Sequence, residues 1–254
     1  MKSFLSWVGG KSRLAPVIVE QFPDHKTYVE VFGGAGWVLF RKEPSHVEVY
    51  NDIDGDLVNL FRVVKHRPSA LAERLSLVLY SRESYYEFIR RWKANPVDEL
   101  ERALSFLYVV RSAFGAKPGG GWAYSKAQNP RSVIALDFIL KVQQRLSAVY
   151  IDGQSYEKVI AAFDSPDTLF YLDPPYWIPG QKFYQHEFNQ EDHMALRDRL
   201  ATIQGKFVLS YNDSAEVRKL YREFKVRATK TIHYSSNNKR DQARMKRELI
   251  IRNF

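Results

Sequence analysis

The stretch Thr27-Tyr28-Val29-Glu30-Val31-Phe32-Gly33-Gly34-Ala35-Gly36 joins an apolar run to a cluster of glycines. The run predicts a short strand. The glycines predict a tight turn, because residues without a Cβ atom let the backbone bend sharply and let a ligand approach it closely. Residues 37–41 suit a helix, and residues 47–50 predict a second strand. Together they predict the strand, turn, helix and strand unit from which open α/β sheets are built.

A second motif, Asp173-Pro174-Pro175-Tyr176, directly follows the apolar run 168–172. It is therefore expected at the carboxyl end of a buried strand, where open α/β sheets bind their ligands. Two consecutive prolines form a stiff turn whose carbonyl groups stay free to accept hydrogen bonds. The Asp173 carboxylate and the Pro174 carbonyl can then orient an amino group, and Tyr176 offers a flat face to a nucleobase. The alternative is an ordinary Asp-Pro turn with Tyr176 in the core.

The remaining pattern predicts a sheet domain interrupted by helices. Helical periodicity without a strand runs through residues 57–65, 70–79, 85–92, 97–113 and 133–146, and the glycine-rich residues 115–122 predict an exposed loop. Strands resume at residues 148–151, 168–172, 206–210, 226–232 and 248–251, with helices at 192–202 and 215–221. We predict an α/β fold with a Rossmann-like sheet domain, residues 1–56 and 148–254, and an inserted helical subdomain, residues 57–147.

Composition narrows the class of protein. The chain has 254 residues, no cysteine and a net charge of +9, and residues 218–254 hold twelve Lys or Arg against three acids. This excess favours binding to a phosphate backbone, although a solvated basic surface is the alternative. The histidines show no metal-ligand spacing, so no metal is predicted. No apolar run has the length of a membrane span or the place of a secretory signal, so we expect a cytoplasmic protein with no membrane partner.

Two further patterns favour a nucleotide-like ligand. Asp52 follows Gly34 by 18 residues and ends a predicted strand, where an acid can bind ribose hydroxyls; it could instead cap the next helix. Trp7-Val8-Gly9-Gly10-Lys11 combines an aromatic ring, glycines and a cation but lacks the spacing of a P-loop. Its alternative is a flexible turn with Lys11 in solvent.

These motifs, in this order along nearly the whole chain, resemble the Dam-type (D12 class) site-specific DNA adenine-N6 methyltransferases. The resemblance includes Tyr184 and Phe188 after the proline motif, the strand from Phe207 to Asp213 and the ending Glu248 to Asn253. It implies a Rossmann-like AdoMet-dependent methyltransferase sheet with an inserted helical DNA-recognition subdomain. The implied cofactor is S-adenosyl-L-methionine (AdoMet), and the implied partner is double-stranded DNA.

The resemblance also implies site residues. Catalysis and base flipping would use Asp173, Pro174, Pro175 and Tyr176. The cofactor would contact Trp7, Gly9, Gly10, Lys11, Glu30, Phe32, Gly34, Gly36, Asp52, Tyr156 and Asp173. DNA would contact Arg111, Lys117, Trp122, Tyr124 and Lys126 in the insert, and Lys239, Arg240, Arg244, Lys246 and Arg247 in the basic region. Arg111 could instead hydrogen-bond the last carbonyls of its own helix.

The predicted reaction is methyl transfer to N6 of adenine in double-stranded DNA. Two alternatives remain open. The acceptor could be RNA adenine or a glutamine side chain, although glutamine methyltransferases have Asn in place of Asp173. The protein could also be an idle DNA-binding regulator, which the intact glycine and proline motifs disfavour.

Overall fold

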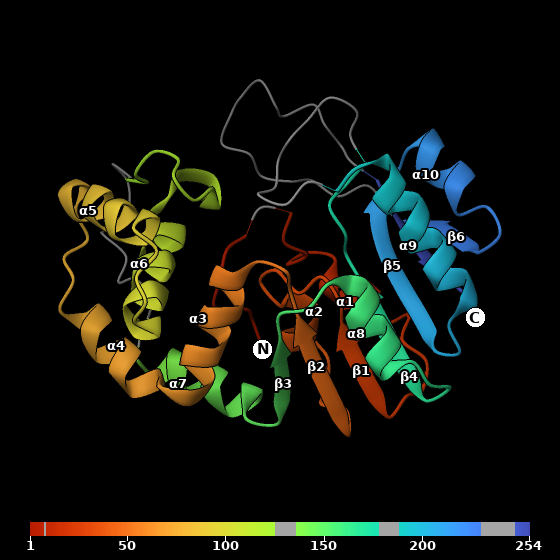
Figure 1. Ribbon diagram of the computed structural model, residues 1–254, viewed down its shortest axis with the longest axis horizontal. Coiled ribbons are helices and arrows are strands. Elements are labelled where there is room, and N and C mark those ends of the chain that lie inside the picture. The colour runs from red at the N-terminus through yellow and green to blue at the C-terminus, as the bar shows by residue number, and fades with distance from the viewer. Residues whose placement is uncertain (8, 125–135, 178–187, 230–246) are drawn as a thin grey trace.

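The computed structural model spans residues 1–254 and describes all of them except residue 8 and residues 125–135, 178–187 and 230–246 (Figure 1). Its centre is a seven-stranded sheet in the order β3-β2-β1-β4-β5-β7-β6. The strands are parallel except β7, which is antiparallel to both of its neighbours. Their bounds are β1 Thr27–Glu30, β2 Val47–Asn51, β3 Val149–Asp152, β4 Thr168–Leu172, β5 Lys206–Asn212, β6 Lys225–Ala228 and β7 Glu248–Arg252.

Both faces of the sheet are covered because its central strands are apolar on both sides. Tyr28 and Val29 are neighbours in β1, yet they belong to different core clusters on opposite faces. Short helices α1 (Ala15–Val19) and α2 (Trp37–Arg41) cover one face with α3 (Gly55–His66). Helices α8 (Tyr156–Phe163), α9 (Gln190–Thr202) and α10 (Ala215–Leu220) cover the other (Figure 1).

The helices from α3 to α7 follow one another between β2 and β3. The four after α3 are α4 (Pro68–Ser76), α5 (Arg82–Lys93), α6 (Glu99–Ser112) and α7 (Leu136–Leu146), and they lie beyond the β3 edge of the sheet (Figure 1). Side-chain caps define where several of them begin: Asp54 caps α3, Ser81 caps α5 and Asp98 caps α6. Core residues of this block and of the sheet form one continuous cluster. None of the described helices is long and apolar enough to cross a membrane.

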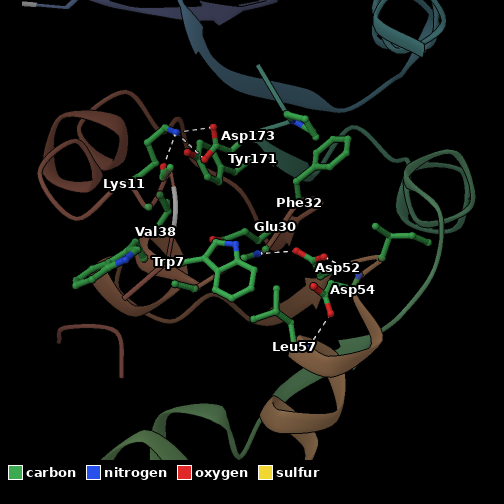
Figure 2. A pocket seen from close by; sticks show the side chains of 18 of the residues that line it. Trp7, Lys11, Glu30, Phe32, Val38, Asp52, Asp54, Leu57, Tyr171 and Asp173 are labelled. Atoms are coloured by element: carbon green, nitrogen blue, oxygen red, sulfur yellow. Dashed lines mark hydrogen bonds and ion pairs between the residues drawn. The ribbon is translucent and has the colours of Figure 1, made fainter. Parts of the chain in front are cut away.

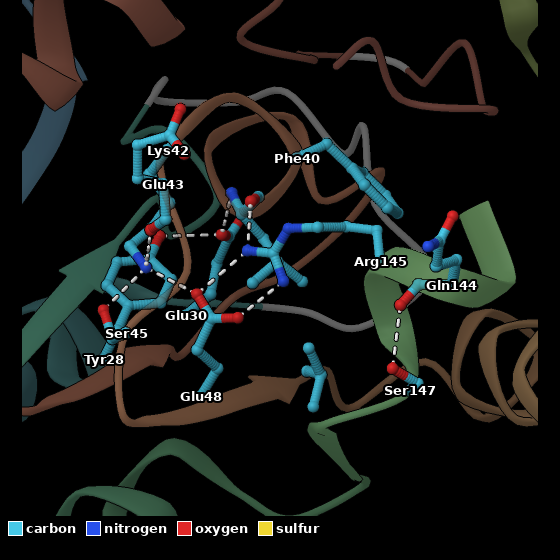
Figure 3. Close-up of polar contacts among 12 residues, drawn as sticks. Tyr28, Glu30, Phe40, Lys42, Glu43, Ser45, Glu48, Gln144, Arg145 and Ser147 are labelled. Carbon is cyan, nitrogen blue, oxygen red and sulfur yellow. Dashed lines mark hydrogen bonds and ion pairs between the residues drawn. The ribbon is translucent and has the colours of Figure 1, made fainter. Parts of the chain in front are cut away.

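A buried ion cluster joins the end of α7 to the sheet (Figure 3). Arg145 donates to both carboxylate oxygens of Glu48 in β2, at 2.5 and 2.9 Å, and to the carbonyl of Leu39 at 2.9 Å. Lys42 binds the same carboxylate at 2.5 Å, and the side chains of Lys42 and Glu48 are each 3% exposed. The cluster therefore fixes α7 against the sheet through ion pairs that are largely shielded from water.

The predicted strands are all present, and the predicted helices differ only near their ends. Helix α4 ends at Ser76 and not at Leu79, and Leu77 and Leu79 are 80% and 77% exposed. The fold also contains α1 and α8, which the periodicity did not predict. Residues 230–232 of the strand predicted at 226–232 and residues 133–135 of the helix predicted at 133–146 lie outside the described residues.

The glycine-rich loop has more structure than predicted. Its ends pair at Ala113 and Trp122, and Phe114 N–H donates to the Gly121 carbonyl at 2.7 Å. The hydroxyl of Tyr85 donates to the Gly120 carbonyl at 2.6 Å. The segment from Ala113 to Trp122 is therefore a short hairpin, which we call the glycine hairpin.

Candidate active site

A cavity of about 340 Å³ opens at the carboxyl ends of β1, β2 and β4 (Figure 2). This is the point where the strand order reverses direction, between β1 and β4, and open α/β sheets bind ligands there. The volume lies within the range of small-molecule sites. The lining consists of Trp7, Gly9, Gly10, Lys11, Glu30, Phe32, Gly33, Gly34, Ala35, Trp37, Val38, Asp52, Ile53, Asp54, Leu57, Lys117, Pro118, Tyr171, Asp173 and Pro175.

The glycine turn after β1 forms the floor of the cavity. Gly34 and Gly36 have φ of +50° and +66°, which favours glycine at both positions. A Cβ atom on Gly33 would come within 2.3 Å of the Tyr50 ring. The Tyr50 hydroxyl in turn donates to the Gly34 carbonyl at 2.7 Å. The sequence motif predicted the glycines, whereas the contribution of Tyr50 appears only in three dimensions.

Asp52 ties the glycine turn to the end of β2. One carboxylate oxygen accepts from Gly34 N–H at 2.7 Å, and the other accepts from Asp54 N–H at 2.8 Å. A carboxylate has about four lone-pair positions, so Asp52 can accept a ligand hydroxyl as well. The helix cap is Asp54, whose side chain accepts from Asp56 and Leu57 N–H. The alternative role of Asp52 as the cap of this helix is therefore wrong.

Glu30 lies at the end of β1, on the cavity wall and 2% exposed. One of its oxygens accepts from the Tyr28 hydroxyl at 2.8 Å and from Leu39 N–H at 2.7 Å. Burial raises the pKa of its carboxyl group to about 8, although both hydrogen bonds oppose the rise. A positively charged ligand in the cavity would favour the ionised form of Glu30.

The N-terminal segment packs over the turn, and Lys11 is only 4% exposed. The alternative of a solvated Lys11 is thus wrong. Gly10 N–H donates to the Trp7 carbonyl at 3.0 Å, and a Cβ on Gly10 would lie 2.9 Å from the Trp37 indole nitrogen. This tight turn directs the Lys11 side chain inward.

Lys11 meets Asp173 at the edge of the cavity (Figure 2). Its ammonium lies 2.7 Å from both carboxylate oxygens and 3.1 Å from the Gly9 carbonyl. The Ser210 hydroxyl in β5 donates to Asp173 at 3.0 Å. Burial raises the pKa of Asp173, while the charge and hydrogen bond of Lys11 oppose the rise. Lys11 therefore favours the ionised form of Asp173.

The proline turn after β4 presents an acceptor and a ring next to this pair. Pro174 is buried, and its carbonyl accepts no hydrogen bond from the described residues. The Tyr176 ring stacks on Tyr211 with centroids 5.9 Å apart and an interplanar angle of 26°. Its hydroxyl donates to Glu248 at 2.7 Å. Tyr211 also contacts His193, the pKa of which burial lowers to about 4, so this imidazole is neutral.

The structure brings together most of the residues predicted to bind a cofactor. Gly36 and Tyr156 lie outside the cavity lining: Gly36 is the N-cap of α2, and Tyr156 stacks on Phe32 at 5.8 Å. The prediction missed Trp37, Ile53 and Leu57 on the cavity wall, and Ser210 and Glu248 behind Asp173. Of these five residues, only Glu248 stands out in the sequence, because it is an acid at the start of an otherwise apolar strand.

The residues predicted to bind DNA are spread over two regions. Arg111 donates to the Phe4 carbonyl at 3.4 Å. Lys117 in the glycine hairpin lies on the cavity lining. Trp122 and Tyr124 stack at 5.5 Å, and Tyr124 is 63% exposed. Arg247 is exposed just before β7. Lys126, Lys239, Arg240, Arg244 and Lys246 lie outside the described residues, as does Tyr184.

The donor set suits an organic cation better than a metal ion. Carboxylates of Glu30, Asp52, Asp54 and Asp173 line the cavity together with the rings of Trp7, Phe32 and Trp37. Among the described residues, no group of three or more His, Asp or Glu side chains could hold a metal. An acidic, partly aromatic cavity with glycines at its floor fits AdoMet, whose sulfonium and ammonium groups are positive.

Comparison with known proteins gives consistent results. A family model described as D12 class N6 adenine-specific DNA methyltransferase matches residues 7–234. The chain is 30% identical to a DNA adenine methylase of Vibrio cholerae over 93% of this chain and 91% of that protein. It is 29% identical to the type II methyltransferase M1.LlaDCHI of Lactococcus lactis over 100% of this chain and 96% of that protein. It is 26% identical to the type II methyltransferase M.MjaIII of Methanocaldococcus jannaschii over 100% and 99%.

Proposed function

The chain belongs to the D12 class of N6 adenine-specific DNA methyltransferases, and from this membership we propose that it methylates adenine within a specific short sequence of double-stranded DNA. AdoMet is the methyl donor that the family implies, and the adenine is rotated out of the duplex, because N6 inside the base stack cannot reach a donor in the cavity. The observation that carries the proposal is the position of Asp173, which belongs both to the cavity lining and to the proline turn.

The donor occupies the cavity above the glycine turn. When bound, AdoMet supplies a methyl group on a positively charged sulfur, so little further activation is needed. Asp52 accepts a ribose hydroxyl, and Glu30 provides negative charge for the positive end of the ligand. Gly34 lets the ligand approach the backbone closely. These roles are supported by the position of Glu30, Gly34 and Asp52, all of which line the cavity.

The extruded adenine lies against the proline turn. Its exocyclic nitrogen is a poor nucleophile until both N–H groups are held, and Asp173 and the Pro174 carbonyl accept them. Tyr176 stacks on the ring, and Pro175 keeps the turn rigid. As the new N–C bond forms, the bond between the methyl carbon and the donor sulfur breaks and leaves a neutral thioether. The nitrogen also loses one proton, and the buried Asp173 carboxylate, the pKa of which is raised, is suited to take it.

Duplex DNA is held by two groups of side chains. One group lies in the insert and contacts the bases of the target sequence: Arg111, Lys117, Trp122, Tyr124 and Lys126. Lys239, Arg240, Arg244, Lys246 and Arg247 contact the phosphates, and the net charge of +9 favours that contact.

Replacing Asp173 tests the proposed chemistry. Asp173→Asn keeps the size of the side chain but removes the charge that strengthens its hydrogen bond to N6. We expect methyl transfer to fall on the order of 100-fold or more, with AdoMet affinity changed far less. Radiolabelled AdoMet offered with DNA, RNA and protein measures the transfer and identifies the acceptor.

The matched control is Asp198→Asn, an exposed acid on α9, which should methylate DNA at the wild-type rate. Near-normal activity of Asp173→Asn would refute the role of Asp173. Label appearing in RNA or protein but not in DNA would refute the proposed substrate.

A further inference from the structure

Glu248 is a buried acid with an unusual position. It is the first residue of β7, pairs with Asn212 of β5 and is 3% exposed, whereas Leu249, Ile250 and Ile251 after it belong to the apolar core. Its backbone is held independently of its side chain, because its N–H donates to Thr229 Oγ1 at 3.1 Å and its carbonyl accepts from Thr229 N–H at 2.8 Å. Burying a carboxylate costs free energy unless partners compensate it. The partners of the Glu248 carboxylate must therefore compensate the cost of burying it.

Two contacts of the carboxylate lead to the catalytic turn. Glu248 Oε2 accepts from the Tyr176 hydroxyl at 2.7 Å and lies 3.9 Å from the Lys11 ammonium. The same ammonium lies 2.7 Å from Asp173 and 4.8 Å from the centroid of the Tyr176 ring. Glu248 thus touches the two side chains that flank Asp173.

We propose that Glu248 is a positioning residue that holds the Tyr176 ring in the orientation needed to receive the target base. It acts through the Tyr176 hydroxyl and contacts none of the reacting atoms. The inference rests on the proposed function, since it concerns how that reaction binds its base. Nothing in the sequence motif itself assigns this role, because Glu248 lies 72 residues after Tyr176.

The physical reason is the cost of ordering a ring. A tyrosine side chain that must be immobilised when the base arrives loses rotamer freedom at that moment, which weakens binding of the base. Tyr211 supports one face of the Tyr176 ring, with centroids 5.9 Å apart, but stacking alone leaves the ring free to slide. The hydrogen bond to Glu248 fixes its far end before the base binds. A charged acceptor makes that bond stronger than a neutral one would.

Three variants separate this role from a merely structural one. Glu248→Met removes the acceptor at similar size, Glu248→Gln keeps an acceptor without the charge, and Tyr176→Phe removes only the hydroxyl. We expect Glu248→Met to lower kcat/KM for DNA roughly tenfold, the value of one charge-assisted hydrogen bond, with AdoMet affinity nearly unchanged. Glu248→Gln should recover part of the loss. In the Tyr176→Phe background, Glu248→Met should cause little further loss.

The base itself provides a second readout. After methylated adenines have been mapped, 2-aminopurine is placed at the target position, where its fluorescence rises when the base leaves the stack. The rise on binding should be smaller for Glu248→Met and for Tyr176→Phe than for the wild type. Asp198→Asn, the exposed acid on α9, is again the control and should give the wild-type fluorescence.

The outcomes decide the inference. If the losses from Glu248→Met and Tyr176→Phe are independent and add, or if the fluorescence is unchanged, the inference is overturned. Should Glu248→Met fail to fold, Tyr176→Phe still decides, since wild-type kinetics and fluorescence in that variant would show that the hydroxyl positions nothing. A wild-type protein that does not methylate DNA would instead overturn the proposed function.

Discussion

Lys11 has an unexpected place among the residues of the site, because it is the counter-ion of Asp173, the acid proposed to hold N6. Asp173 must be ionised to accept from the amino group, yet burial raises its pKa and Lys11 opposes that rise. Lys11 therefore favours the ionised form of Asp173, in addition to its proposed contact with the cofactor. Removing the cation should raise the pKa of Asp173 further.

Lys11→Met tests this directly. A raised pKa keeps the carboxyl group protonated to higher pH, so the acidic limb of the kcat profile should move up by roughly one to three pH units. Activity lost at low pH should return as the pH rises. The profile is measured at saturating AdoMet and DNA, and Lys11→Arg, which keeps the charge, should shift it much less. An unshifted limb in Lys11→Met would show that Lys11 does not set the ionisation of Asp173.

Among the residues of the site, those that belong to local sequence motifs could be predicted, whereas those that reach the site from distant strands could not. The positions of Asp173 and Asp52 beside the cavity could be predicted, because each follows an apolar run and the carboxyl ends of such strands lie at one edge of the sheet. Ser210 and Glu248 could not be assigned roles, since they reach Asp173 and Tyr176 only once β5 and β7 have paired. A single sequence contains no spacing that relates these residues.

Among the elements, the glycine turn after β1 depends most closely on its neighbours. Gly33→Ala would place a methyl group against the Tyr50 ring, which cannot move aside because it stacks on Phe61 at 3.9 Å. We expect the free energy of unfolding to fall by roughly 1–3 kcal/mol. AdoMet binding should weaken as well, because Tyr50 also holds the Gly34 carbonyl. Thermal unfolding and equilibrium binding of AdoMet measure the two effects.

Gly121→Ala provides the control within the same chain. A Cβ at Gly121 would have no atom within 4 Å, so this variant should unfold and bind AdoMet like the wild type. Equal effects from the two substitutions would mean that the steric argument for Gly33 is wrong.

The elements themselves were predictable where apolar periodicity is long. All seven strands and the helices of the insert follow from it, because a buried face repeats at regular spacing. Helix α1 has only five residues, too few for a period to show, and unlike the equally short α2 it does not follow a strand and a glycine turn. The glycine hairpin was predicted as a loop because its glycines show no strand pattern, and the bond from Tyr85 that holds the Gly120 carbonyl comes from a distant helix.

For the molecule as a whole, the attachment of the insert depends on the buried cluster of Arg145, Glu48 and Lys42. Arg145→Met would leave the Glu48 carboxylate with half of its partners in a site that excludes water. We expect the free energy of unfolding to fall by roughly 3 kcal/mol, the lower end for breaking a buried ion pair. Urea denaturation followed by circular dichroism measures it.

The exposed pair on α5 provides the comparison. Arg90 lies 2.5 Å from Glu87, as close as Arg145 lies to Glu48, but the Arg90 side chain is 73% exposed. Arg90→Met should leave the urea midpoint unchanged, because water replaces the lost contact. Midpoints that fall equally in the two variants would contradict the claim that burial makes the Arg145 cluster important.

Whole-molecule arrangement was predictable in outline. The change from strand to helical periodicity near residue 57 and its return near residue 148 predicted the run of helices between β2 and β3. That residues 57–147 form a separate subdomain stays a prediction. That α7 is joined to β2 through Arg145 was not predictable, because a lone basic residue near a helix end is usually solvated.

The antiparallel strand β7 has a consequence for synthesis on the ribosome. It lies between β5 and β6, which are both synthesised earlier. These two strands therefore lack the partner that joins them until residue 252 has left the ribosome. Until then the flank of β5 is an unpaired edge open to wrong partners, and Tyr176 lacks its acid. A product truncated before β7 should therefore expose this edge and be prone to aggregation.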